Sequence, residues 1–141
     1  MKRVLTIAAI AALLISCTAQ QPASEVEDKT PGFVLSDGNV EVKIGEDGAL
    51  LSLVNKETGH NYASGEGLWR MFYNTHQEKE MQIDGTENTP AVSQEGDVIT
   101  ITYKDLVHRG KALKMDLTLT VKVEDGAVRF GSVVSNNEPG T

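Results

Sequence analysis

The sequence predicts an all-β fold, an antiparallel β-sandwich, for the residues that follow an N-terminal signal helix. In residues 113–123 every odd position is apolar and every even position is polar or charged, as expected of a strand with one buried face. Asp-Gly pairs at 37, 47, 84 and 125 supply turns at intervals along the chain. Because no stripe of helical period follows the signal, short strands joined by turns are the expected architecture.

Residues 1–16 have the features of a lipoprotein signal peptide. A basic start precedes an apolar run over 4–15, which is too short to span a bilayer comfortably. The Leu-Ile-Ser-Cys sequence that ends at Cys17 resembles the lipobox of bacterial lipoproteins, whose cysteine is diacylated and becomes the new N-terminus after cleavage. We therefore expect lipid on Cys17. The alternative is an ordinary secretory signal that leaves a free cysteine.

The predicted anchor makes the membrane a partner of the chain through Cys17. Each buried acyl CH₂ contributes about 0.8 kcal/mol to membrane attachment, so two or three acyl chains anchor a protein stably where a single chain would not. Residues 17–31 offer no apolar period and should form a flexible tether. Thr18 rather than Asp follows the cysteine, which resembles the sorting rule that permits passage to the outer membrane in some Gram-negative bacteria. The expected location is the cell envelope, with the outer membrane favoured.

Composition limits the partners. The formal net charge is −7, and cleavage before Cys17 removes Lys2 and Arg3, which takes the net charge to −9. An acidic chain of this kind argues against nucleic acid and against a basic membrane-binding patch. Cys17 is the one cysteine, so neither an internal disulfide nor a thiolate zinc cluster is expected.

Residues 32–141 form the predicted sandwich domain, which opens with a hairpin. Residues 39–44 alternate, 45–48 turn, and 49–54 return as the second strand. Residues 55–59 make the next turn.

The remaining strands follow from the same alternation of apolar and polar residues. They are expected at 68–73, 80–84, 97–103, 113–123 and 127–134. Residues 135–141 read as a connection between strands, so we expect the domain to be truncated there and to continue in a longer protein. A frayed tail is the alternative.

Several of these segments together resemble a known family. Residues 39–44, 48–59, 68–70 and 133–137 are similar to the N-terminal β-sandwich of large secreted bacterial glycoside hydrolases, which has a galactose mutarotase-like fold and forms part of a supersandwich. The opening hairpin is the most specific part. In that family the sandwich packs on a catalytic (β/α)₈ barrel and is not itself the catalytic unit. A barrel needs about 250 residues, so this chain is expected to lack one.

The resemblance predicts a carbohydrate-associated module without catalytic residues of its own. Aromatic residues make up 5% of the chain, which is sparse for a carbohydrate-binding surface. Because a sugar stacks its apolar face on an aromatic ring, any such surface depends on Trp69 and the three tyrosines. The candidate carbohydrate-binding residues are Trp69, Arg70, Tyr73 and His76. The same alternation that places Trp69, Met71 and Tyr73 on one face also permits Trp69 to be core packing.

No cofactor or metal is expected. His60, His76 and His108 lie far apart without the spacing that presents imidazoles jointly to zinc, and we interpret them as solvated loop residues.

Two other functions stay open. The chain could be a complete small lipoprotein that acts as a binding or scaffolding module in the cell envelope. It could instead be a mutarotase, because residues 73–76 superficially resemble the histidine-bearing stretch of that family. The glutamate base of the mutarotases comes from the later half of their fold, which is expected to be missing, so this hypothesis is the weakest.

Overall fold

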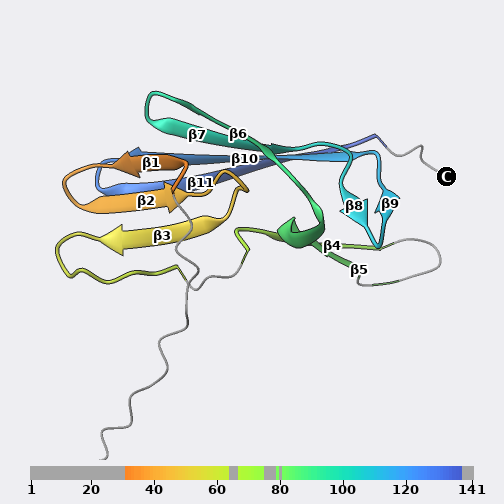
Figure 1. Ribbon diagram of the computed structural model, residues 1–141, viewed down its shortest axis with the longest axis horizontal. Helices are drawn as coiled ribbons and strands as arrows, with labels where there is room; N and C mark the ends of the chain where they lie inside the picture. The colour runs from red at the N-terminus through yellow and green to blue at the C-terminus, as the bar shows by residue number, and fades with distance from the viewer. Residues whose placement is uncertain (1–30, 64–66, 75–78, 80, 138–141) are drawn as a thin grey trace, which may run out of the picture.

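Two antiparallel sheets face each other and make the sandwich (Figure 1). The computed structural model describes residues 31–63, 67–74, 79 and 81–137. The smaller sheet has the order β1-β2-β3, and the larger has the order β11-β10-β7-β6. The strands of the first are β1 (Phe33–Ser36), β2 (Val40–Ile44) and β3 (Leu50–Asn55); those of the second are β6 (Ala91–Glu95), β7 (Val98–Tyr103), β10 (Met115–Glu124) and β11 (Ala127–Asn136).

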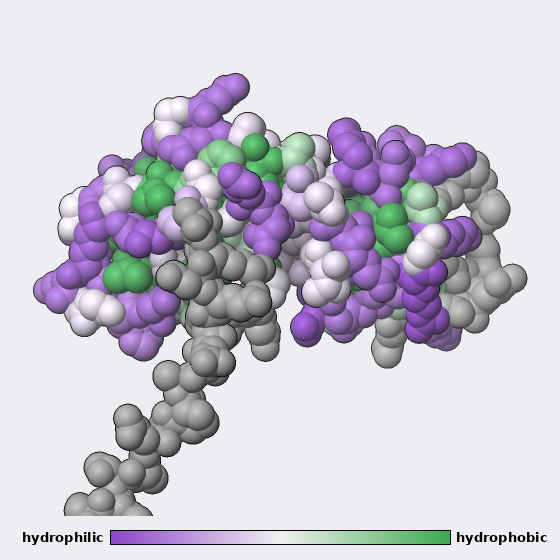
Figure 2. All heavy atoms as spheres, viewed as in Figure 1, coloured by the Kyte–Doolittle hydropathy of each residue, from purple (hydrophilic) through white to green (hydrophobic). Residues whose placement is uncertain are grey.

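Two short hairpins extend the sandwich at one end, where they form a second lobe. β4 (Arg70–Tyr73) pairs with β5 (Met81–Asp84), and β8 (Val107–His108) pairs with β9 (Lys111–Ala112). The 3₁₀ turn η1 (Gly85–Glu87) connects β5 to the chain that enters β6. Figure 2 shows the two lobes under a largely hydrophilic surface that is broken by smaller hydrophobic patches.

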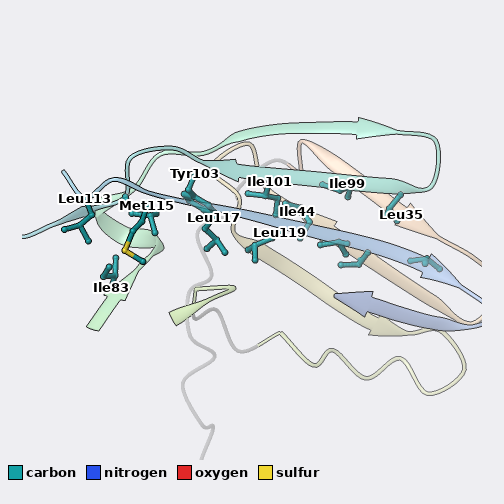
Figure 3. Packing of buried hydrophobic residues seen from close by; sticks show 14 residues of the cluster. Leu35, Ile44, Ile83, Ile99, Ile101, Tyr103, Leu113, Met115, Leu117 and Leu119 are labelled. Atoms are coloured by element: carbon teal, nitrogen blue, oxygen red, sulfur yellow. The ribbon is translucent and has the colours of Figure 1, made fainter. Parts of the chain in front are cut away.

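The core lies between the two sheets and continues beneath the hairpins (Figure 3). Alternate residues of β10, from Met115 to Val123, are buried, as the sequence pattern predicts. The antiparallel register sets Leu119 opposite Ile101 and Val121 opposite Ile99, so these apolar side chains share one face of the sheet. Val42 and Ile44 of β2 are fully buried within the same cluster.

A carboxylate joins the turns at the outer end of the sandwich. Asp37 accepts hydrogen bonds from the backbone N–H of Asn39 at 2.8 Å and of Val40 at 2.9 Å. Its other oxygen accepts from the N–H of Gly126 at 2.9 Å, in the turn between β10 and β11. These bonds lower the pKa of Asp37 below its ordinary value of 3.8; the bond from Val40 has the largest effect. The β1–β2 turn is thereby tied to the other sheet.

The prediction of an all-β, antiparallel sandwich is confirmed. Each strand expected from alternation is present, but β4 and β10 begin two residues later than expected, at Arg70 and Met115. β11 continues two residues into the predicted connection, to Asn136. Three further features were not predicted: β1, β6, and the small β8–β9 hairpin. The predicted signal, Cys17 and nearly all of the tether lie outside the described residues. In the described part of the chain, no helix has the length and apolar character needed to cross a bilayer.

Candidate functional site

An open cleft of about 900 Å³ lies where the sandwich meets the β4–β5 hairpin. Its volume falls within the roughly 300–1,000 Å³ range of ligand sites. Its walls come from four places in the sequence, namely the β2–β3 turn, the start of β4, the segment that contains η1, and the end of β7. The lining residues are Asp47, Gly48, Ala49, Gly67, Leu68, Trp69, Arg70, Asp84, Gly85, Thr86, Asn88, Thr89, Pro90 and Tyr103.

Two aromatic rings pack against each other in the cleft lining. Trp69 and Tyr103 meet edge to face, with ring centroids 5.1 Å apart and planes at 66°. Tyr103 belongs to the core, whereas Trp69 is half-buried and packs against that core. Burial raises the pKa of the Tyr103 phenol above its ordinary value of 10.0, an effect that the neighbouring Trp69 indole partly opposes. Trp69 therefore serves as core packing and as cleft wall together.

The indole nitrogen of Trp69 lies beside the Tyr103 hydroxyl. Nε1 is buried and has no hydrogen-bond partner with full geometry among the described residues, yet it is close enough to the hydroxyl to lower the pKa of the Tyr103 phenol. Because Nε1 is buried, a group in the cleft reaches this N–H only if the side chains around it move.

Asp84 supplies a fixed carboxylate to the wall. Its Oδ1 accepts from the Thr86 hydroxyl at 2.6 Å and from the Thr86 N–H at 3.0 Å. The hydroxyl bond is the largest cause of a lowered pKa, and the charge of Arg70, its partner across the β4–β5 pair, adds a smaller effect. The group therefore stays ionised at neutral pH and is suited to accept hydrogen bonds from ligand hydroxyls.

Asn88 holds the η1 segment in place. Its amide donates to the carbonyls of Asp84 and Val107 at 3.0 and 3.1 Å, and its oxygen accepts from the Val107 N–H at 2.7 Å. The two bonds with Val107 fasten the segment to β8, and the bond to Asp84 holds Asn88 on the end of β5. The position of Asp84 thus depends on a contact between parts of the chain that are distant in sequence.

A second, smaller hollow of about 160 Å³ shares Asp84 and Thr86 with the cleft. His108 contributes to its wall and meets the ring of Tyr73 edge-on, with centroids 6.0 Å apart at 89°. The Nε2 atom of His108 is buried and has no hydrogen-bond partner among the residues that the structure describes. The interpretation of His108 as a solvated loop residue is therefore wrong, because this residue is half-buried in β8.

The structure brings together some of the predicted carbohydrate-binding residues. Trp69 and Arg70 both line the large cleft. Tyr73 is half-buried at the far end of β4, beside His108, and does not line the cleft. His76 lies outside the described residues. The predicted pair of faces in β4 is present, since Met71 and Tyr73 are half-buried and Arg70 and Phe72 are exposed.

Other cleft residues were not predicted. The Asp-Gly pair at 84 indicated a turn, and its carboxylate could have been considered as a ligand-binding group on that ground. Tyr103 ends a strand of regular alternation, so the sequence predicted only that its side chain lies in the core. Asn88 stands in a stretch with no recognisable pattern, and nothing in the sequence indicated its role.

In the described ranges, no group of three His, Cys, Asp or Glu side chains could hold a metal ion. Comparisons with protein-family models, with curated proteins and with solved structures find no match. The cleft is therefore the feature from which a function can be inferred.

Proposed function

We propose that this chain is the carbohydrate-binding β-sandwich module of a lipid-anchored glycoside hydrolase whose catalytic barrel is a separate part of the same enzyme. The proposal includes attachment to the envelope, with the outer membrane favoured, through lipid on Cys17. The observation that supports it best is the cleft, in which the indole of Trp69 lies among side chains that hydrogen-bond hydroxyl groups.

A sugar has the two kinds of surface that this cleft offers. The apolar face of a pyranose packs on an aromatic ring, and its hydroxyls both donate and accept hydrogen bonds. Asp84 accepts, while Thr89 adds a further polar group to the same wall as Trp69. A few convergent polar groups beside an apolar wall are typical of small-molecule sites.

The cleft is directly testable, because Trp69 is the one tryptophan of the chain. Titration with glucose, galactose, maltose, cellobiose and lactose should change the Trp69 emission in a saturable way. Trp69→Phe keeps a ring in the wall but removes the N–H donor, and by calorimetry it should weaken binding about tenfold, as expected for a lost hydrogen bond.

Tyr62→Phe is the matched control, since Tyr62 is an aromatic residue that is 61% exposed and lies outside the cleft lining. It should bind like the wild type. If none of the five sugars alters the emission, or if both variants behave alike, the carbohydrate proposal fails.

The anchor is tested independently of the sugar. Cys17→Ser should move the protein from the membrane fraction to the soluble fraction. It should also abolish labelling by radioactive palmitate, because the variant lacks the sulfur atom to which the lipid is attached. Retention of label in the variant would contradict lipidation at Cys17.

A scaffolding module of the cell envelope is a second candidate, favoured by one feature. Among the described residues β11 pairs on one side only, with β10, and it exposes Phe130, Val133 and Val134. A long open strand edge can bind an extended segment of another protein by strand addition.

A further inference from the structure

The two hollows adjoin each other at the end of β5. Asp84 and Thr86 line both of them, so the large cleft and the small one share part of their walls. The small hollow is lined by Gln82, Ile83, Asp84, Thr86, Glu87, Val107, His108 and Arg109. At about 30 Å³ for each water, its 160 Å³ has room for a few waters or for part of a hydroxylated ring.

Each hollow has one unsatisfied ring nitrogen in its lining residues. Three buried side-chain polar atoms of the described residues lack a hydrogen-bond partner: Ser52 Oγ, Trp69 Nε1 and His108 Nε2. Trp69 belongs to the large cleft and His108 to the small one. Two of the three atoms that lack partners thus belong to residues that line these two adjoining hollows.

The backbone around the small hollow is held by hydrogen bonds from both sides. The Glu87 carboxylate accepts from the Arg109 N–H at 2.9 Å, and the Asn88 oxygen accepts from the Val107 N–H at 2.7 Å. The ring of Tyr73 packs on His108. The hydrogen bonds fix the backbone of β8, which carries His108, on the η1 segment.

The charges around the two hollows nearly balance. The charged lining residues are Asp47, Asp84 and Glu87 against Arg70 and Arg109. Neither an anionic nor a cationic ligand gains a strong net attraction from this set. A neutral ligand rich in hydroxyls fits it best.

We infer that the site spans both hollows and takes a neutral oligosaccharide of at least two sugar units, one in the Trp69 cleft and the next with a hydroxyl on His108 Nε2. Nε2 is buried in the wall of the small hollow, so this contact requires the imidazole to turn toward the ligand. A nitrogen of a neutral imidazole donates or accepts a hydrogen bond according to the tautomer of the ring. A sugar hydroxyl can bond to it in both cases, because a hydroxyl both donates and accepts. This inference rests on the proposed carbohydrate function.

The test compares one sugar unit with two. Glucose and galactose are titrated against maltose, cellobiose and lactose, and the dissociation constants are taken from Trp69 emission and from calorimetry. At least one disaccharide should bind on the order of tenfold more tightly than its monosaccharides, as one or two added hydrogen bonds predict. His108→Phe keeps an aromatic ring against Tyr73 but lacks the nitrogen, so it should remove this gain and leave monosaccharide binding unchanged.

His60→Phe is the matched control, because His60 is an exposed histidine that also packs on a tyrosine, Tyr62, away from both hollows. It should retain the gain. Equal affinity for one and two units, or a His108→Phe variant that keeps the gain, overturns the two-hollow site while monosaccharide binding still supports the proposed function. If no sugar of the panel binds, both proposals fall together.

Discussion

At the scale of single residues, Asp37 should make the stability of the domain fall as the pH is lowered into the acid range. Its pKa in the folded protein is lowered below 3.8, chiefly by hydrogen bonds from backbone N–H groups. A lowered folded-state pKa means that the carboxylate stabilises the fold above the unfolded-state pKa. This contribution is lost as the pH falls through the folded-state value.

The variant Asp37→Asn should therefore melt at a lower temperature than the wild type at neutral pH, and the difference should shrink below about pH 4. Circular dichroism melts across this pH range measure it. Asp97→Asn is the control, since the nearest basic group to the exposed Asp97 carboxylate is Lys122 at 4.0 Å. Parallel melting curves for Asp37→Asn and wild type at every pH would show that the turn does not need the charge.

At the scale of elements, the turn between β10 and β11 requires glycine at its second position. Asp125 and Gly126 both have positive φ, of 54° and 76°, as in a type I′ hairpin turn. A Cβ on Gly126 would also lie 2.5 Å from Nδ2 of Asn39. Backbone strain and this clash act together on one residue.

Gly126→Ala should thus lower the free energy of unfolding by about 1–3 kcal/mol, measured by urea denaturation. Gly38→Ala tests the specificity of the effect, because Gly38 has no positive φ and a Cβ there meets nothing within 4 Å. If the two alanine variants lose equal stability, the turn geometry is not the cause.

The strands differ in how far their sequences predict them. β10 could be located because it is buried on one face along its whole length. Four of the five residues of β6 are exposed, so burial imposes no alternation on it. β8 and β9 have two residues each, too few to show a period. In β6, β8 and β9 the local sequence therefore lacks a pattern long or regular enough to predict a strand.

The cleft could be predicted only in part, because its walls come from segments that are distant in the sequence. Trp69 and Arg70 could be proposed from their side-chain chemistry alone. The proximity of Asp47, Asp84 and Tyr103 to them arises from how β2, β5 and β7 pack together, and local sequence carries no information on such distances. Tyr103 in particular is both core and wall, a dual role that alternation cannot express.

At the scale of the whole molecule, the larger sheet has an open edge at β11. This strand of ten residues pairs with β10, and within the described chain its other side has no partner strand. Val133 is 65% exposed and Phe130 is 49% exposed. A long apolar edge with free backbone donors and acceptors favours pairing with another chain.

Self-association of the purified protein at high concentration is therefore expected, and Val133→Lys should reduce it, because a charged side chain on an edge strand opposes strand pairing. Sedimentation velocity over a range of concentrations measures the effect. Thr120→Lys adds the same charge on the paired strand β10, away from the edge, and should change association less. A wild type that stays monomeric throughout would mean that the β11 edge is protected in solution. Equal effects of the two lysines would assign the association to net charge rather than to the edge.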